Sequence, residues 1–249
     1  MVIVKSQAEI RKIGEACRIV AEILAGLKAH MAVGMTTVDI ESFVDEAMRK
    51  RGAIAAFRGY RGYPSSVCVS VNDQVIHGIP SQSTRLKNGD IVGVDLGVIL
   101  DGFYGDAAMT IAVGDIQPEA ARLMEVTEKA LSLGIEEAVA GNRIGDISAA
   151  IQEHVEANGF SVVRAFVGHG IGRSLHEDPQ VPNFGRRGQG LRLKEGMTLA
   201  IEPMVNAGGH EVRILEDGWT ALTSDGSLSA HFEHTIAVTK HAPKILTKY

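Results

Sequence analysis

The sequence predicts an α+β fold in which helices cover a strongly curved, mostly antiparallel sheet built from two similar halves. One observation is an internal repeat, because residues of one type recur 107 positions apart, as Gly34 and Gly141 do (141 − 34). The repeat includes two acids set in apolar runs, Asp95 and Glu202. The other matched pairs are Asp39 with Asp146, Ile40 with Ile147, Gly52 with Gly159 and Gly89 with Gly196. A second echo is Thr-Ile-Ala-Val, which occupies residues 110–113 and 235–238.

The third observation is that the two halves are continuous, since no Pro- or Ser-rich linker separates them. We therefore expect one domain over residues 1–249, with pseudo-symmetric halves at approximately 1–115 and 116–249. The chain is 45% apolar and 22% charged, which rules out disordered and collagen-like classes. Its formal net charge of −5 argues against a protein that binds mainly nucleic-acid phosphates.

The compartment follows from what the sequence lacks. Two cysteines, Cys17 and Cys68, cannot build a disulfide framework. No basic start followed by an apolar stretch marks a secretory signal, and no apolar run reaches membrane-spanning length. We expect a cytoplasmic protein.

The first half opens with two helices. Ser6 and Glu9 form a predicted capping box, ahead of an apolar face that includes Ile13, Cys17 and Leu24. Thr36 and Asp39 predict the second helix, which we expect to end at Gly52.

The second half repeats this order. Pro118 suits the first turn of a helix, and the next helix is expected to be capped by Asp146 and ended by Gly159.

The segment 90–113 (DIVGVDLGVILDGFYGDAAMTIAV) predicts a β-hairpin, since Asp101-Gly102 favours a type I′ turn. With that turn Asp95 faces Ala108, so Asp95 and Asp106 share one face of the sheet. Diagonal neighbours on a face lie roughly 7–8 Å apart. Two such carboxylates repel unless a cation or a shared proton relieves them. Solvated turn aspartates are the alternative, but apolar residues bracket Asp95.

The second half supplies matching acids. Glu202 interrupts the apolar run 199–204, and Glu233 shares a strand face with Thr235. His169 lies among glycines in 168–172 (GHGIG), where the backbone can approach its neighbours closely. Four carboxylates with one imidazole suit two divalent ions about 3.5–4 Å apart.

Other catalytic motifs are missing from the sequence. His176-Glu177 begins like a zincin helix, but Gln180 replaces the second histidine. There is no G-x-S-x-G elbow, no G-x-G-x-x-G fingerprint and no C-x-x-C pair.

The acids, His169 and their surroundings resemble the methionine aminopeptidases. The matching motifs are 72–80 (NDQVIHGIP), 168–173 (GHGIGR), His176-Glu177 and 232–235 (FEHT). The 33 positions between His169 and Glu202 (202 − 169) leave no room for the insertion of the type II branch. The resemblance therefore implies a short, bacterial-style type I enzyme with the pita-bread fold, as a single catalytic domain without an N-terminal extension.

The resemblance also implies a mechanism. Asp95 would bind one divalent ion and His169 with Glu202 the other, while Asp106 and Glu233 bridge both. The ions (Co, Mn, Fe or Zn) would activate a water, with Glu202 as general base and later acid. His176 would stabilise the oxyanion, and His77 would contact the substrate amide.

The same resemblance assigns a methionine pocket. Its walls would be Phe57, Tyr60, Tyr63, Cys68, Leu175 and Trp219, together with the two histidines His77 and His176. Aromatic walls suit a thioether, although the residues alone would read as core packing. Phe57, Leu175 and His231 differ from the residues usual at these positions.

We expect a monomer that removes the initiator methionine from nascent polypeptides with a small second residue. Two alternatives stay open: a proline-directed aminopeptidase of the same fold, and a catalytically silent binding protein. A basic stretch, Arg186, Arg187, Arg192 and Lys194, is a candidate for weak contact with the ribosome, although such runs are usually solvated loops.

Overall fold

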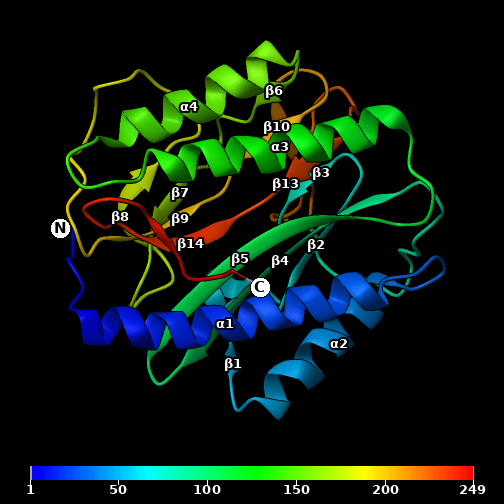
Figure 1. Cartoon of the computed structure of the whole chain (residues 1–249). Coiled ribbons are helices and arrows are strands. Elements are labelled where there is room, and N and C mark those ends of the chain that lie inside the picture. The colour runs from blue at the N-terminus through cyan, green and yellow to red at the C-terminus, as the bar shows by residue number, and fades with distance from the viewer. Residues whose placement is uncertain (1, 249) are drawn as a thin grey trace.

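The computed structural model describes residues 2–248, and it places four α-helices over a set of antiparallel strands (Figure 1). The helices are α1 Gln7–His30, α2 Thr37–Lys50, α3 Pro118–Glu136 and α4 Ile144–Ala157, with a short 3₁₀ turn at Tyr60–Gly62. The long helices α1 and α3 cover one face of the strands, with α2 packed beside α1 and α4 beside α3 (Figure 1). The predicted α+β class is confirmed.

The strands pair antiparallel throughout, but their hydrogen bonds divide them into four sheets rather than one. The first sheet contains β1 Ile54–Ala55, β2 Cys68–Val71, β4 Ile91–Leu100 and β5 Phe103–Ala112. The largest contains β7 Gly168–Gly170, β8 Glu177–Val181, β9 Thr198–Ile201, β14 His234–Ala237 and β15 Lys244–Ile245. The third sheet contains β6 Ser161–Val162, β10 Met204–Asn206 and β13 Ser229–His231. The fourth contains β3 Gln74–Ile76, β11 Val212–Ile214 and β12 Ala221–Thr223.

The predicted repeat corresponds to matching elements. Helix α2 shifted by 107 positions coincides with α4 at both ends. The same shift carries the single strand β4 onto two strands, β9 and β10. The Thr-Ile-Ala-Val echo, with its shift of 125 (235 − 110), carries β5 onto β13 and β14. The second half therefore copies the first with each long strand interrupted once.

The interruptions fall at two of the predicted ligands. Glu202-Pro203 separates β9 from β10, and Phe232-Glu233 separates β13 from β14. The pairs His234↔Ile201 and Met204↔His231 keep one register across the gap. Pro203 has no N–H to donate, and the Glu233 N–H donates instead to the Ala108 carbonyl of β5 at 2.9 Å. The ladder breaks there for these two reasons.

Two hydroxyls join the halves in a reciprocal way. Thr235 Oγ1 donates to the carbonyl of Asp106 at 2.7 Å, and Thr110 Oγ1 donates to the carbonyl of His231 at 2.9 Å. The shift of 125 relates Thr110 to Thr235 and Asp106 to His231. These two bonds are therefore equivalent under the internal two-fold symmetry.

Two predicted capping boxes are confirmed, and one predicted cap is wrong. Ser6 with Glu9 and Thr36 with Asp39 form capping boxes on α1 and α2. Asp146 is not the N-cap of α4: Arg143 occupies that position, and the Asp146 carboxylate accepts its N–H at 2.7 Å. Asp146 is the counterpart of Asp39, which holds the same third helical position in α2.

The β4–β5 hairpin has the predicted register, with Asp95 opposite Ala108 and positive φ at both Asp101 and Gly102. Gly105 of β5 lies directly against the backbone of Cys17 in α1, so the odd residues of this strand face the helix. Asp106 therefore points to the opposite face, and Asp95 shares that face. None of the helices in residues 2–248 is long and apolar enough to cross a membrane.

Candidate active site

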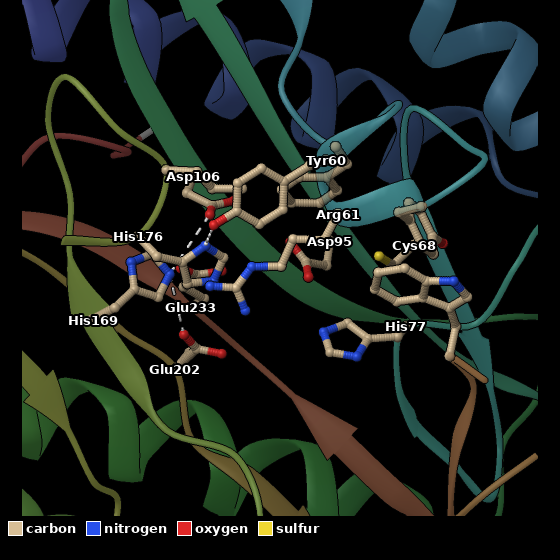
Figure 2. Close-up of a pocket in the computed structure, with 14 residues that line it drawn as sticks. Tyr60, Arg61, Cys68, His77, Asp95, Asp106, His169, His176, Glu202 and Glu233 are labelled. Atoms are coloured by element: carbon tan, nitrogen blue, oxygen red, sulfur yellow. Dashed lines mark hydrogen bonds and ion pairs between the residues drawn. The ribbon is translucent and has the colours of Figure 1, made fainter.

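Four acidic side chains and one imidazole converge on the face of the strands that is turned away from α1. Asp95 comes from β4 and Asp106 from β5, while Glu202 and Glu233 come from the two strand interruptions. Figure 2 shows these acids and His169 directed into one cavity. Ligand atoms of Asp106, His169 and Glu233 all lie within 4.8 Å of one another. Because the register continues across the two interruptions, Glu202 and Glu233 lie opposite one another.

The imidazole is fixed by its strand. Gly168 and Gly170 of β7 pack so closely that a Cβ atom would lie 2.4 Å from the Ala200 carbonyl oxygen and 2.2 Å from that of Asp178. His169 Nδ1 donates to the Gly170 carbonyl at 2.9 Å, which leaves the lone pair on Nε2. That Nε2 lies 3.5 Å from Glu202 Oε1 and 3.9 Å from Asp106 Oδ2. The nitrogen therefore faces the carboxylates in the form that binds a metal.

The electrostatics of the acid cluster fit a bound cation. Burial raises the pKa of Asp95 to about 7. Burial also raises the pKa of Asp106, Glu202 and Glu233 well above their usual range, with the charge of Asp95 adding to it in each case. Asp95 Oδ1, Asp106 Oδ1 and Glu233 Oε1 are buried without a hydrogen-bond partner among residues 2–248. Unpaired buried oxygens of this kind are the ligands that a divalent ion needs.

Two segments that contribute residues to the cavity wall contact each other through Tyr60 and His176. We call residues 58–66 the Tyr60 segment and residues 172–177 the His176 segment. The Tyr60 hydroxyl lies 2.9 Å from His176 Nδ1, and the two rings stack with centroids 5.2 Å apart (Figure 2). The His176 ring also lies against that of His169, with centroids 4.2 Å apart.

Helix α2 holds the Tyr60 segment in place through one carboxylate. Glu41 accepts hydrogen bonds from the Ser65 hydroxyl at 2.6 Å and from the Ser66 N–H at 3.2 Å. It also pairs with Arg58 at 3.0 Å. This anchor lies outside the cavity, and sequence reasoning gave no sign of it.

The four histidines near the cavity are neutral at pH 7. Burial lowers the pKa of His169 and of His231 to about 3. It lowers the pKa of His77 and of His176 to about 4, with the charge of Arg61 a smaller cause at His176. His77 has a left-handed backbone, with φ of +61°, and lies edge-on to Trp219 with ring centroids 6.2 Å apart. Each of these imidazoles therefore has one donor and one acceptor nitrogen.

The structure brings all the predicted site residues to one cavity of about 140 Å³. The predicted residues that line it are Phe57, Tyr60, Tyr63, Cys68, His77, Asp95, Asp106, His169, Leu175, His176, Glu202, Trp219 and Glu233. The apolar members belong to one buried cluster that includes Phe57, Tyr63, Cys68 and Leu175. Burial raises the pKa of Cys68, so its thiol stays protonated as part of this wall.

One lining residue was missed by the sequence. Arg61 lines the cavity and lies over the Tyr60 ring at 5.4 Å, with a left-handed φ of +49°. The glycines on either side, Gly59 and Gly62, also have positive φ. No motif identified in the sequence pointed to this arginine.

His231, which departs from the expected pattern, is buried beside the acid cluster. Its Nε2 lies 3.8 Å from Glu202 Oε2, on the side of the carboxylate away from His169. Thr110 Oγ1 accepts its N–H at 2.9 Å as well as donating to its carbonyl. Glu202 thus lies between two imidazoles.

Comparisons with a family model, with curated sequences and with solved structures all match this chain to metallopeptidases. The model of metallopeptidase family M24 matches residues 11–240. A methionine aminopeptidase of Clostridium perfringens is 53% identical over 247 residues, covering 99% of each chain. The crystal structure of a methionine aminopeptidase from Thermotoga maritima is 48% identical, with a TM-score of 0.98 and full coverage of both chains.

A more distant structure shares the fold alone. The prolidase of Pyrococcus horikoshii is 24% identical with a TM-score of 0.78, and the match covers all of this chain but 64% of the prolidase. The predicted fold is confirmed by both structures.

Proposed function

The chain belongs to metallopeptidase family M24, and we propose that it is a metal-dependent aminopeptidase that removes the N-terminal methionine from peptides with a small second residue. One observation carries this proposal: buried acids with unpaired oxygens lie at the base of a cavity whose walls are apolar and aromatic. The base suits hydrolysis assisted by a divalent cation, and the walls suit an uncharged side chain such as that of methionine.

The ligand set would be Asp95, Asp106, His169, Glu202 and Glu233. When bound, two divalent ions (Co, Mn, Fe or Zn) would supply the Lewis acidity that activates water and would attract a free α-amine. The unpaired oxygens of Asp95, Asp106 and Glu233 and the lone pair on His169 Nε2 support this assignment. Asp106 and Glu233 are the candidates for bridging positions.

The chain's own residues would move the proton and hold the peptide. Glu202 lies beside His169 in the acid cluster, where its carboxylate would take a proton from water and return it to the leaving amine. The Tyr60 hydroxyl lies 2.9 Å from His176 Nδ1; with Tyr60 as the donor of this bond, the His176 Nε2–H would donate to the oxygen of the scissile carbonyl. His77 is placed on the opposite wall, beside Trp219, where it would contact the substrate amide.

The methionine side chain would occupy the space between Phe57, Tyr63, Leu175 and Trp219. Phe57 and Leu175 are buried, with exposed fractions of 8% and 2%. Compared with the residues usual at these positions in the family, Phe57 is larger and Leu175 is smaller. Both sides of the space therefore keep an apolar wall. Selectivity for methionine would then come from the depth of the pocket that these residues enclose.

Two other functions have less support. A proline-directed peptidase shares the fold, but the prolidase is much longer than this chain and is under 25% identical. A catalytically silent binding protein would be expected to have lost ligands, whereas this chain has all five residues.

The test is cleavage of a Met-Ala-Ser peptide by the purified protein supplied with Co²⁺, Mn²⁺ or Fe²⁺, compared with a peptide that starts Met-Pro and one that starts Ala-Pro. We expect release of methionine and no cleavage of Ala-Pro. The variants Asp106→Ala and Glu233→Ala should lose both bound metal and methionine release, by at least about 1,000-fold in rate. Elemental analysis gives the metal content of each variant, and circular dichroism of the same samples separates loss of metal from loss of fold.

Lys50→Met provides the control, because Lys50 is exposed, does not line the cavity and pairs with Glu46 on the surface of α2. Full activity of either acid variant would contradict the ligand assignment. An intact Met-Ala-Ser peptide with every metal would contradict the pocket assignment.

Three further expectations belong to this proposal: a single catalytic domain acting as a monomer, a cytoplasmic location and weak contact of the basic stretch with the ribosome. Arg187 is held within the fold by Glu137 and Glu153, and Arg192 donates to the Gly141 carbonyl. Arg186 and Lys194 are therefore the members best placed for such a contact. Charge reversal of these two residues should weaken sedimentation with ribosomes, and unchanged sedimentation would rule the contact out.

A further inference from the structure

The start of the chain carries a buried lysine. Residues 2–6, which we call the N-terminal strap, run into α1 at one end of the molecule (Figure 1). The Lys5 N–H donates to the Gly196 carbonyl at 2.8 Å, which fixes the backbone of the strap. The Lys5 side chain is only 3% exposed. A lysine is rarely buried so completely unless its charge is paired.

The partner of Lys5 is the residue that follows His176. The Lys5 ammonium pairs with Glu177 Oε2, and the Glu177 side chain is 7% exposed. The other oxygen, Glu177 Oε1, accepts the N–H groups of Arg173 at 2.8 Å and Ser174 at 3.2 Å. One carboxylate therefore ties the turn of the His176 segment to the N-terminal strap.

The packing at Gly172 is fitted to the lysine. A Cβ atom on Gly172 would lie 2.5 Å from Lys5 Cε and 2.9 Å from Glu177 Oε1. The Tyr104 N–H of β5 donates to the Gly172 carbonyl at 2.8 Å, which holds this residue against the lysine. Lys5 is thus held by Gly196 at its backbone, by Glu177 at its ammonium and by Gly172 along its side chain.

A second link joins the same two parts of the chain. Arg173 pairs with Glu9, the acid of the α1 capping box, at 3.2 Å. Its guanidinium also lies over the Phe103 ring at 4.6 Å. The first turn of α1 therefore supports the outer side of the His176 segment, and Lys5 supports the inner side.

We propose that Lys5 is a positioning residue that, through Glu177, sets the place of Leu175 and His176 in the wall of the cavity. This inference rests on the proposed function for the roles of Leu175 and His176. The segment between Gly172 and Glu177 is short, so a shift of its anchored ends moves both side chains. His176 must keep its bond to Tyr60, and small displacements of a positioned group cost a large part of a reaction rate.

Removal of the lysine leaves the Glu177 charge buried without its partner. That carboxylate can then turn toward water and release the N–H groups of Arg173 and Ser174. The effect differs from simple loss of stability, because it is confined to one segment. Amide hydrogen exchange measures it directly in the protein without added metal.

The test compares wild type with Lys5→Met, a substitution that keeps the length of the side chain and removes its charge. We expect faster exchange of the Arg173 and Ser174 amides, with exchange in α3 unchanged. We expect kcat/KM on Met-Ala-Ser to fall by about 10- to 100-fold well below the melting temperature. Lys50→Met, which removes the exposed ion pair with Glu46, is the control and should change neither quantity.

Two further variants keep the test decisive. The double variant Lys5→Met/Glu177→Gln removes both charges and should recover part of the amide protection lost in the single variant. Gly172→Ala leaves both charges but crowds the Lys5 side chain and Glu177 Oε1 together, so it should also give faster exchange and tests the Lys5–Glu177 pair even if Lys5→Met does not fold.

Unchanged exchange at Arg173 and Ser174 in either folded variant would overturn the proposal. Faster exchange with unchanged kcat/KM would overturn the positioning of His176. If the wild-type protein cleaves no peptide, the proposed function fails while the exchange measurement still decides whether the strap anchors the segment.

Discussion

At the scale of single residues, Tyr60 lines the cavity as predicted and also makes a contact that its motif did not imply. The resemblance made it a wall of the methionine pocket, whereas its hydroxyl lies 2.9 Å from His176 Nδ1. Burial lowers the pKa of His176 to about 4, so the ring is neutral at pH 7. A hydroxyl that donates to Nδ1 places the remaining proton on Nε2, which is the nitrogen available to a substrate carbonyl.

We therefore predict that Tyr60→Phe lowers kcat on a Met-Ala-Ser peptide by about 10- to 100-fold, with KM changed by less than about twofold. The ring and its packing remain, so the pocket keeps its shape while His176 loses the bond that fixes its tautomer. Steady-state kinetics give the two constants, and ¹⁵N shifts of the His176 ring report the tautomer in metal-free protein.

Tyr104→Phe is the matched control, since Tyr104 packs against the same apolar cluster behind the pocket. It should leave both constants close to wild type. Equal effects of the two substitutions, or an unchanged ring tautomer in Tyr60→Phe, would assign Tyr60 to the wall alone.

The residues that the sequence predicted well are those set by local rules. The Asp101-Gly102 turn determines the hairpin register, so the shared face of Asp95 and Asp106 followed from spacing. Lys5 and Glu177 could not be paired in this way, because 172 positions separate them (177 − 5) and only the folded chain joins them. Arg61 was missed because the direction of a side chain in a left-handed turn is not encoded by composition.

At the scale of elements, the interrupted strands explain how one repeat gives an asymmetric site. Asp95 and Glu202 are equivalent under the shift of 107, but Asp106 is equivalent to His231 and Ala108 to Glu233 under the shift of 125. The sequence predicted a single curved sheet, and the loss of ladder bonds at Pro203 and Glu233 splits it. A periodic pattern cannot predict that split, because both runs remain apolar and strand-like.

The reciprocal threonines hold the two halves in register, and we predict a cost for removing one. Thr235→Val keeps the shape of the side chain but leaves the buried Asp106 carbonyl without its 2.7 Å donor. The free energy of unfolding should fall by about 1–3 kcal/mol. Denaturant unfolding of the metal-free protein, followed by circular dichroism, measures it.

Thr239→Val is the corresponding control, because Thr239 bonds to Ala242 in an exposed turn. Its effect should stay within about 0.5 kcal/mol. A loss as small as this in Thr235→Val would mean that the Asp106 carbonyl finds another donor and that the threonine does not join the halves.

At the scale of the whole molecule, the acid cluster links stability to pH. The four clustered carboxylates account for most of the formal charge of −5, yet burial raises the pKa of each. Between pH 7 and 8.5 these acids are ionised in the unfolded chain, whereas their raised pKa values favour the protonated form in the metal-free folded protein. The histidines are neutral in the folded protein, and their contribution fades as pH rises above 7, because their unfolded pKa is about 6.5.

Stability falls as pH rises wherever the folded state binds more protons than the unfolded state. We therefore predict that the metal-free protein loses about 1.4 kcal/mol of unfolding free energy per pH unit, between pH 7 and 8.5, for each proton that the site retains.

A bound divalent ion replaces those protons, so Mn²⁺ or Co²⁺ should raise the melting temperature more at pH 8 than at pH 7. Asp106→Asn should flatten the pH dependence, because it removes one of the mutually repelling carboxylates. Asp45→Asn should not, because Asp45 lies outside the cavity, where it pairs with Arg58. Melting temperatures of the metal-free wild type that stay constant across this range would mean that the four acids do not share the buried, uncompensated charge on which the proposed metal site depends.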